Sequence, residues 1–134
     1  MLLTKENDYG VRIIRALAAR EKLNVEAICG VEQIPAQFAY KILKKLTSAG
    51  LVESKRGREG GYRLTKALHA FTLHDVMAAI NNDLLIFECL RDDITCSFKE
   101  AVSPCKVHKE LRRLQKILVE EMQFKSMYEV LNST

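Results

Sequence analysis

The chain has 134 residues, of which 48% are hydrophobic, and a formal net charge of +4 at pH 7. This length suits one domain, or a small domain with an appended helix, and the apolar fraction can support a core. No apolar run approaches membrane-spanning length, and the N-terminus is polar from its fourth residue, so the sequence gives no sign of a secretory signal. We therefore expect a cytoplasmic protein with no membrane partner and no structural disulfides.

The first part of the chain predicts three helices. Thr4 can cap a helix that ends near Glu21–Lys22, and a short second helix follows at Val25–Val31, punctuated by Gly30. Pro35 fits the first turn of a third helix, and Gly50 suits its left-handed end. Apolar residues recur along this third helix at helical spacing; they are Phe38, Ile42, Leu43, Leu46 and Ala49.

A β-hairpin and a fourth helix are expected next. Leu51–Ser54 and Tyr62–Thr65 predict two strands around a glycine-rich basic turn. Thr72 and Asp75 have the spacing of a capping box, which opens a helix at His74–Ile80 that ends near Asn81–Asn82.

Three helices followed by a two-stranded hairpin predict a winged helix-turn-helix, a mostly α fold with a small β-hairpin wing, over residues 1–80. Residues 41–66 hold eight basic and two acidic side chains, a local net charge of +6. A basic stripe on a near-neutral body is typical of a protein that binds the phosphate backbone of double-stranded DNA.

The helix at Pro35–Ala49 is the predicted recognition helix. Its exposed residues Ala36, Gln37 and Tyr40 are expected to face bases, and glutamine can bond adenine in a bidentate manner. The charged residues expected to contact phosphate or the grooves are Lys41, Lys44, Lys45, Lys55, Arg56 and Arg58. Each feature also has an interpretation without DNA. The three lysines of the helix can form a solvated face, Gln37 and Tyr40 can be ordinary helix surface, and the glycines can serve a plain hairpin turn.

The last part of the chain divides into a loop at 81–105 and a long helix with a tail at 106–134. The loop has no periodicity and has room for one helical turn, and Pro104 can open the helix. An apolar stripe follows at four- and three-residue steps; it consists of Val107, Leu111, Leu114, Leu118 and Met122. A partner helix is the natural cover for this stripe, so we expect a homodimer. The tail after Phe124 can continue as a short helix.

The loop contains a candidate metal site. Cys89, Cys96, Cys105 and His108 follow the pattern Cys-x6-Cys-x8-Cys-x2-His. Soft thiolates suit an iron–sulfur cluster, 2Fe-2S or 4Fe-4S, which usually takes four ligands and can be lost when protein is handled in air. The alternatives are scattered loop thiols, a zinc ion held by three cysteines and a histidine, and a surface role for His108. Cys29 is expected in the core.

The segment LTSAGLVESKRGREGGYRLTK at 46–66 resembles the wing of the Rrf-type family of regulators that includes IscR, NsrR and CymR. The opening LLTKENDYGVRIIRALA and the later FTLHDVMAAI are similar to the same family, and the similarity covers essentially the full chain. The resemblance implies a homodimer with a long dimerisation helix and a site that often holds an iron–sulfur cluster. It also implies that Arg56 enters the minor groove and that Pro35, Gln37 and Tyr40 make the base contacts.

By the same resemblance the three family cysteines correspond to Cys89, Cys96 and Cys105. Asp8 matches an aspartate that supplies the fourth ligand from the other subunit in NsrR-like members. The two gaps here, of six and eight residues, are longer than the compact spacing typical of cluster-binding members. Some relatives lack a cluster and use thiols or protein partners.

No enzyme signature is present, whether phosphate loop, nucleophile elbow or paired metal histidines. The expected function is that of a DNA-binding transcriptional regulator, with a repressor as the main expectation. It would sense iron–sulfur status, nitric oxide or redox state. The first alternative is a cluster-free regulator of the same fold, switched by thiol oxidation or by a partner protein. The second is a zinc-stapled adaptor that never binds DNA specifically, against which the basic wing argues.

Overall fold

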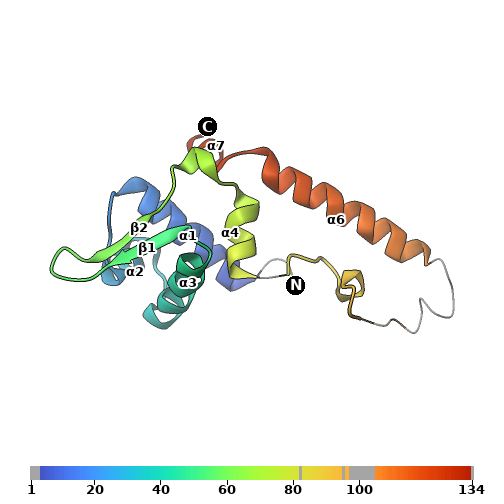
Figure 1. Ribbon diagram of the computed structural model, residues 1–134, viewed down its shortest axis with the longest axis horizontal. Coiled ribbons are helices and arrows are strands. Elements are labelled where there is room, and N and C mark those ends of the chain that lie inside the picture. The colour runs from blue at the N-terminus through green and yellow to red at the C-terminus, as the bar shows by residue number, and fades with distance from the viewer. Residues whose placement is uncertain (1–3, 82, 95, 97–104, 134) are drawn as a thin grey trace.

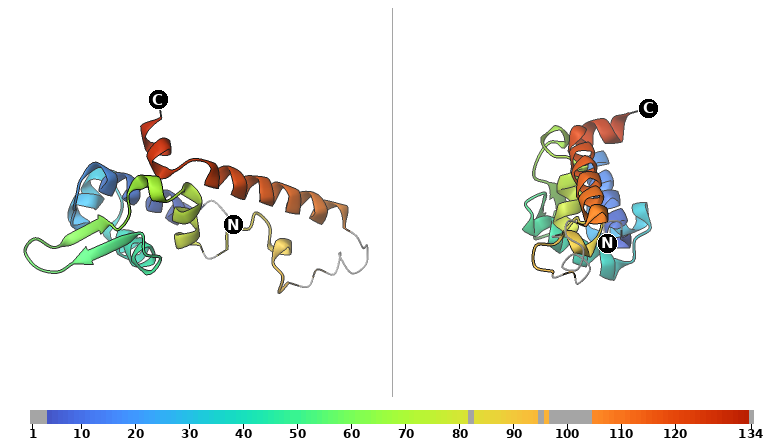
Figure 2. Two further views of the ribbon diagram at one scale, coloured as in Figure 1. Left: turned by 45° about the horizontal axis from the view of Figure 1, so that its top comes forward. Right: turned by 90° about the vertical axis from the view of Figure 1, so that its right-hand side faces the viewer.

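The computed structural model describes residues 4–81, 83–94, 96 and 105–133 (Figure 1). A helical body with a projecting hairpin occupies one end of an elongated molecule, and one long helix extends from it toward the other end. The turned views in Figure 2 show that the long helix projects past the body, with only its C-terminal end beside it.

Helix α1 (Lys5–Ala19) begins where Thr4 predicts it, because the Thr4 side chain and Asn7 form a reciprocal capping box. It ends two residues before the predicted Glu21–Lys22. Helix α2 (Val25–Glu32) is capped by Asn24, and its end is set by Gln33, which has φ 54° and ψ 53°. The prediction that Gly30 punctuates this helix was wrong, since Gly30 lies inside it.

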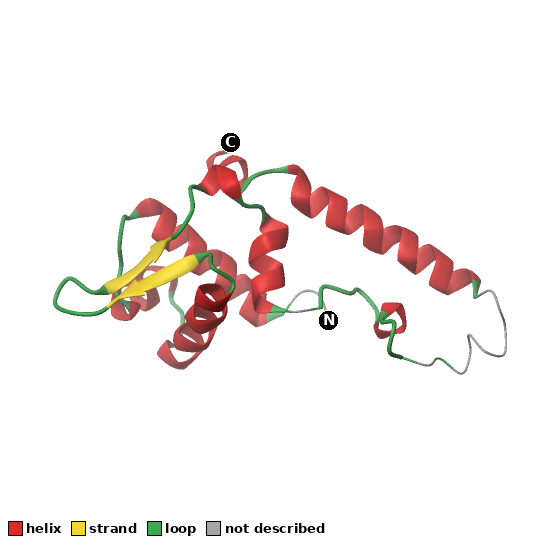
Figure 3. Cartoon of the chain, in the orientation of Figure 1, coloured by secondary structure: helices red, strands yellow, loops and turns green. Residues whose placement is uncertain are grey.

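Helix α3 (Ala36–Ser48) follows one residue later than predicted, with Pro35 as its N-cap rather than in its first turn. Gly50 has φ 77°, as its predicted role at the left-handed end of the helix requires. Strands β1 (Val52–Lys55) and β2 (Gly61–Leu64) then form an antiparallel hairpin (Figure 3). Both strands are shifted by one residue from the predicted ranges.

One core joins the helices to the hairpin. Its fully buried side chains include Ile13, Ile28, Ile42, Leu46 and Val76. Burial of side chains of this size stabilises the fold by about 1.5–3 kcal/mol each. This core fixes the relative positions of α1, α2, α3 and the base of the hairpin.

The 3-10 turn η1 (Leu68–Ala70) leads into α4 (Leu73–Ile80), which is capped by the predicted Thr72–Asp75 box. A second 3-10 turn, η2 (Glu88–Leu90), is the one predicted helical turn of the cysteine segment. Helix α6 (Lys106–Phe124) begins with Cys105 as its N-cap. Pro104, predicted to open this helix, and Asn82, predicted to end α4, lie outside the described residues.

Helix α7 (Met127–Asn132) is the short helix expected after Phe124. It returns to the body: the Met127 side chain is fully buried in the main core, and the Met127 N–H donates to Phe71 O over 2.8 Å. An isolated bridge between Thr72 and Ser126 closes the same junction. The stretch between α4 and α7, which carries the three loop cysteines and α6, is therefore attached to the body at both of its ends.

Candidate nucleic-acid interface and cysteine segment

Helix α3 buries one face and presents the other to solvent. Ala39, Ile42, Leu43 and Leu46 have exposed fractions of zero and hold the helix against the core. The opposite face carries the side chains predicted to contact DNA, all exposed; these are Pro35, Gln37, Tyr40, Lys41 and Lys44. Tyr40 is 58% exposed, so its ring is accessible from solvent.

The hairpin projects beyond the body as a wing. Lys55 pairs with Gly61 in register, so Arg56 and Arg58 lie in the connecting turn, and all three basic side chains are exposed. A Cβ atom at Gly60 would come within 2.5 Å of Lys55 O, so the tight turn requires glycine there. Tyr62 exchanges two backbone hydrogen bonds with Leu23, of 2.7 and 3.0 Å, which attach the base of the wing to the body.

An acidic side chain from outside residues 41–66 contacts the basic stripe, and the charge count of those residues does not predict this contact. Glu6 on α1 bridges two of the predicted phosphate contacts, with Lys41 Nζ 2.6 Å from Oε1 and Lys45 Nζ 2.8 Å from Oε2. Hydrogen bonds from the two ammonium groups hold the pKa of Glu6 below its usual range. Lys45 Nζ also donates to Ile80 O over 3.1 Å, so this lysine joins α1, α3 and the end of α4.

A second group of charges, also not predicted, fixes α2 against α1. The buried Glu32 carboxylate accepts from Arg15 Nε over 3.0 Å, and Glu32 O accepts from Arg12 Nη1 over 3.2 Å. Arg12 also pairs with Asp8, at 3.0 Å between Nη2 and Oδ2. Asp8, the expected fourth metal ligand, therefore forms an ion pair on the surface of α1, where half of its side chain is exposed.

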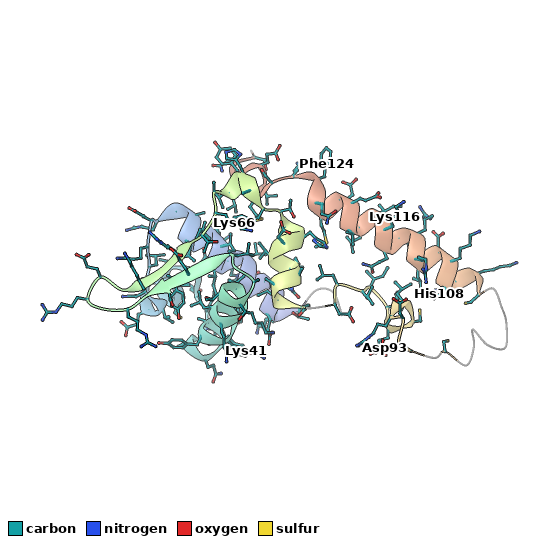
Figure 4. All side chains as sticks on the ribbon, viewed as in Figure 1. Lys41, Lys66, Asp93, His108, Lys116 and Phe124 are labelled. Carbon is teal, nitrogen blue, oxygen red and sulfur yellow. The ribbon has the colours of Figure 1, made fainter. Side chains whose placement is uncertain are left out.

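The three loop cysteines lie apart from the main core. Cys89 lies in η2, Cys96 follows it, and Cys105 caps α6, where its Sγ accepts from His108 N over 3.4 Å. All three are free thiols of intermediate exposure. Within residues 4–81, 83–94, 96 and 105–133, a single chain does not bring three His, Cys, Asp or Glu side chains together as metal ligands. His108 lies on the side of α6 that faces η2, within hydrogen-bond distance of Arg112 (Figure 4).

Cys29 is half-buried against the main core, and burial raises the pKa of its thiol. The expected core position is therefore met only in part, since Cys29 packs against the core without being fully buried. His69 stacks on Tyr128 with ring centroids 4.0 Å apart, which helps to hold α7 against η1.

Specific contacts anchor the cysteine segment to the two helices beside it. The Gln115 amide of α6 accepts from Ile86 N over 2.8 Å and donates to Leu84 O over 2.9 Å, as a neighbouring strand would. Asn81 donates to the buried Asn7 over 2.8 Å, which attaches the start of the segment to the start of α1. The segment is therefore attached to α1 and α6 by these three hydrogen bonds.

Helix α6 has no fully buried residue. The predicted apolar stripe divides into two faces: Leu118 and Met122 pack against α4 and the cysteine segment, whereas Val107 and Leu114 are exposed. Ile117 and Phe124 add to the exposed apolar surface, with Phe124 77% exposed.

This fold, with an exposed basic face on α3 and a basic wing, defines a winged helix-turn-helix DNA-binding protein. The sequence pattern of the family described as "Rrf2: Iron-dependent Transcriptional regulator" matches residues 3–133. The chain therefore belongs to the Rrf2 family of transcriptional regulators, and it is a regulator rather than an enzyme.

Individual relatives agree with this assignment. The chain is 36% identical to Protein aau3 of Rhizobium meliloti over 92% of its own length and 80% of that protein. It is 31% identical to the HTH-type transcriptional regulator NsrR of Bacillus licheniformis over 69% of its own length and 67% of that protein. The solved structure of CymR, described as the global cysteine regulator of B. subtilis, has the same fold, with a TM-score of 0.75 at 20% identity over 100% of this chain and 98% of that one.

In the part of the chain that the structure describes, none of the helices combines the length and the apolar character that crossing a membrane requires.

Proposed function

We propose that this protein is an operator-binding repressor whose DNA affinity is set by an iron–sulfur cluster held by Cys89, Cys96 and Cys105. The observation that carries the proposal is the arrangement of the molecule: an exposed basic reading face at one end, and a separate cysteine segment attached to the same body. The family description "Iron-dependent" supports the choice of iron.

For DNA recognition, α3 enters the major groove and presents Pro35, Gln37 and Tyr40 to base edges, while Lys44 and Lys55 bind phosphate. The wing tip places Arg56, with Arg58 beside it, at the minor groove. Within the described residues, no carboxylate lies within ion-pairing distance of Lys44, Lys55, Arg56 or Arg58. These four side chains can therefore bind DNA without first breaking an ion pair.

The wing is tested by Arg56→Ala, measured as operator affinity at fixed salt. We expect a loss of about tenfold or more and a weaker preference for A·T base pairs at the flanking minor groove. Lys66→Ala is the matched control, since it removes one positive charge beyond the hairpin. Equal affinities of wild type and Arg56→Ala would refute the wing assignment.

The DNA-binding unit is a homodimer held by α6. A helix of this length with no buried residue and with Val107, Leu114 and Ile117 exposed requires a second apolar surface, and a second copy of α6 provides one. Leu114→Glu places a charge in that surface. We expect sedimentation to show monomer and operator binding to fall by at least about a hundredfold, because each half-site contact is weak alone. Lys109→Glu, at an exposed position away from Leu114 around the same helix, is the control and should remain dimeric.

The thiols of the cysteine segment fit the proposed cluster by their chemistry: three soft ligands outside the main core, one of them at the amide donors of a helix N-terminus. His108 or Asp8 of the other subunit completes the set. Bound at these residues, the cluster supplies a redox- and nitric oxide-reactive centre. The residues of the segment would hold it, and the hydrogen bonds of Gln115 and Asn81 attach that segment to α6 and α1.

Anaerobic reconstitution with iron and sulfide tests the sensor. The wild type should gain a visible absorption band, and Cys89→Ala, Cys96→Ala or Cys105→Ala should remove it. Cys29→Ala is the matched control and should keep the band. His108→Ala and Asp8→Ala should differ, since only the true fourth ligand destabilises the cluster. A wild type that binds no iron would refute the cluster.

The second candidate keeps the DNA module and senses through thiol oxidation or a partner protein. It is favoured by the fold shared with CymR and by the long gaps between the three cysteines. Operator affinity measured before and after mild oxidation of cluster-free protein separates it from the first candidate. If neither iron nor oxidation changes that affinity, the cysteine segment has no switching role.

A further inference from the structure

The feature that the proposed function leaves unexplained is the carboxylate of Glu6. Two of the lysines on α3 are already bound by it, at 2.6 Å for Lys41 and 2.8 Å for Lys45. The Glu6 side chain is 23% exposed, whereas those of the lysines are 57% and 33% exposed. The two ion pairs therefore lie at the surface, where a phosphate group can reach the same ammonium groups.

The geometry of α3 makes this binding relevant to DNA. Gln37, Lys41 and Lys45 are spaced by four residues, so they lie on one side of the helix. A duplex that meets Gln37 therefore brings its phosphates toward the lysines that Glu6 holds. Lys44 differs from these two, since its ammonium group has no carboxylate partner among the described residues.

We propose that Glu6 is a specificity-determining residue that competes with DNA phosphates for Lys41 and Lys45. Non-specific binding depends almost wholly on phosphate contacts, so a carboxylate that occupies two lysines weakens it most. At the operator, base contacts by α3 hold phosphates close enough to displace Glu6. The ratio of operator to non-specific affinity is thereby raised. This inference rests on the proposed placement of α3 in the major groove.

The first test is Glu6→Gln, which removes the charge and keeps the shape. Affinity for a duplex of unrelated sequence should rise about three- to tenfold at low salt, as expected for release of two partly exposed ion pairs. Affinity for the operator should rise less, so the ratio falls. Glu21→Gln is the control, since it removes one exposed carboxylate just beyond the end of α1. Equal gains in the two variants would reduce the effect to net charge and overturn the proposal.

The second test asks whether the gain depends on the two lysines. Lys41→Ala and Lys45→Ala together should change binding to the unrelated duplex by less than about twofold in the wild type, but should remove the whole gain in Glu6→Gln. A loss of the same size in both backgrounds would show that Glu6 does not hold the lysines back. Glu6→Asp keeps the charge but shortens the arm, and should show part of the gain.

Two measurements keep the outcomes distinct. Thermal unfolding shows whether Glu6→Gln is folded. If it is not, Lys41→Ala in the wild type still decides, since among the described residues the Lys41 ammonium group is bound by Glu6 alone; a loss of tenfold or more on the unrelated duplex contradicts the proposal. The Arg56→Ala titration reports separately on the proposed function. If Arg56→Ala weakens operator binding but Glu6→Gln changes neither affinity, the proposed function stands and only the role of Glu6 is refuted.

Discussion

The two ends of this molecule are stabilised in different ways. The DNA-reading end has a continuous core in which Ile13, Ile28, Ile42 and Leu46 are fully buried. The cysteine end is held by a two-residue buried cluster, Met77 and Leu84, by partly buried neighbours and by a few side-chain hydrogen bonds. A surface that must match DNA requires the first arrangement, whereas the proposed switching role of the cysteine segment would require contacts that break at small free energy.

Replacing one methionine at each end of the molecule gives the strongest test of this difference in packing. Met127 is fully buried in the main core, and Met122 is only partly buried in the smaller cluster. Met127→Ala should lower the free energy of unfolding by about 2–5 kcal/mol, because it leaves a cavity that the core cannot close. Met122→Ala should lower it by less than half as much. Urea unfolding measures both, and equal losses would mean that the two ends are equally packed.

Gln115→Leu tests the cysteine end alone. It removes both hydrogen bonds to Leu84 and Ile86, and each is worth about 1 kcal/mol. Amide hydrogen exchange at Ile86 should become about tenfold faster, while the unfolding midpoint of the main core stays unchanged. Lys109→Leu, at an exposed position of the same helix, is the control. An equal loss of protection at Ile42 would contradict the separation of the two ends.

A smaller effect is expected at the turn between α2 and α3. Gln33 has the left-handed conformation that favours glycine, and Gly30 lies in a helix with open space around its Cα. Gln33→Gly and Gly30→Ala should each raise the free energy of unfolding by about 0.5–1 kcal/mol. Calorimetry measures the gains, and they should add. Destabilisation by Gly30→Ala would show that α2 does not continue through this residue.

The smallest effect is the pH dependence of the Glu6 ion pairs. Hydrogen bonds from Lys41 and Lys45 lower the pKa of Glu6, so its contribution to stability is present above the usual carboxyl pKa and is lost as the pH falls through the lowered value. Both pairs are partly exposed, so Glu6→Gln should be less stable than wild type by under about 1 kcal/mol near pH 7. The difference should shrink as the pH falls through the lowered pKa of Glu6. A difference independent of pH would mean that Glu6 acts by packing.

The sequence predicts those parts of the fold that depend on neighbouring residues. The caps at Thr4 and Thr72 and the left-handed Gly50 are local patterns, and the structure confirms them. The wing could be predicted because its strands and glycine turn follow one another directly. The exposed reading face of α3 follows from the spacing of its apolar residues.

The remaining features depend on contacts between distant residues, which no periodicity shows. Glu6 lies 35 residues from Lys41 and 39 from Lys45, so the basic stripe looked nearly unopposed in the sequence. The stripe on α6 predicts one face, but the folded chain covers Leu118 and leaves Leu114 exposed. Gln33 is a different case: its left-handed conformation belongs to a local helix cap, in which Gln33 N–H and Ile34 N–H both donate to Cys29 O, but its residue type gives no signal of it.

The burial of Met127 has a consequence for how the protein is made. The ribosome releases the reading helix and the wing early, yet the core that supports them also needs a side chain near the end of the chain. A chain interrupted before residue 127 leaves Phe71 and its neighbours uncovered and is a substrate for proteases. We therefore expect chains that end before residue 127 to be removed before they accumulate.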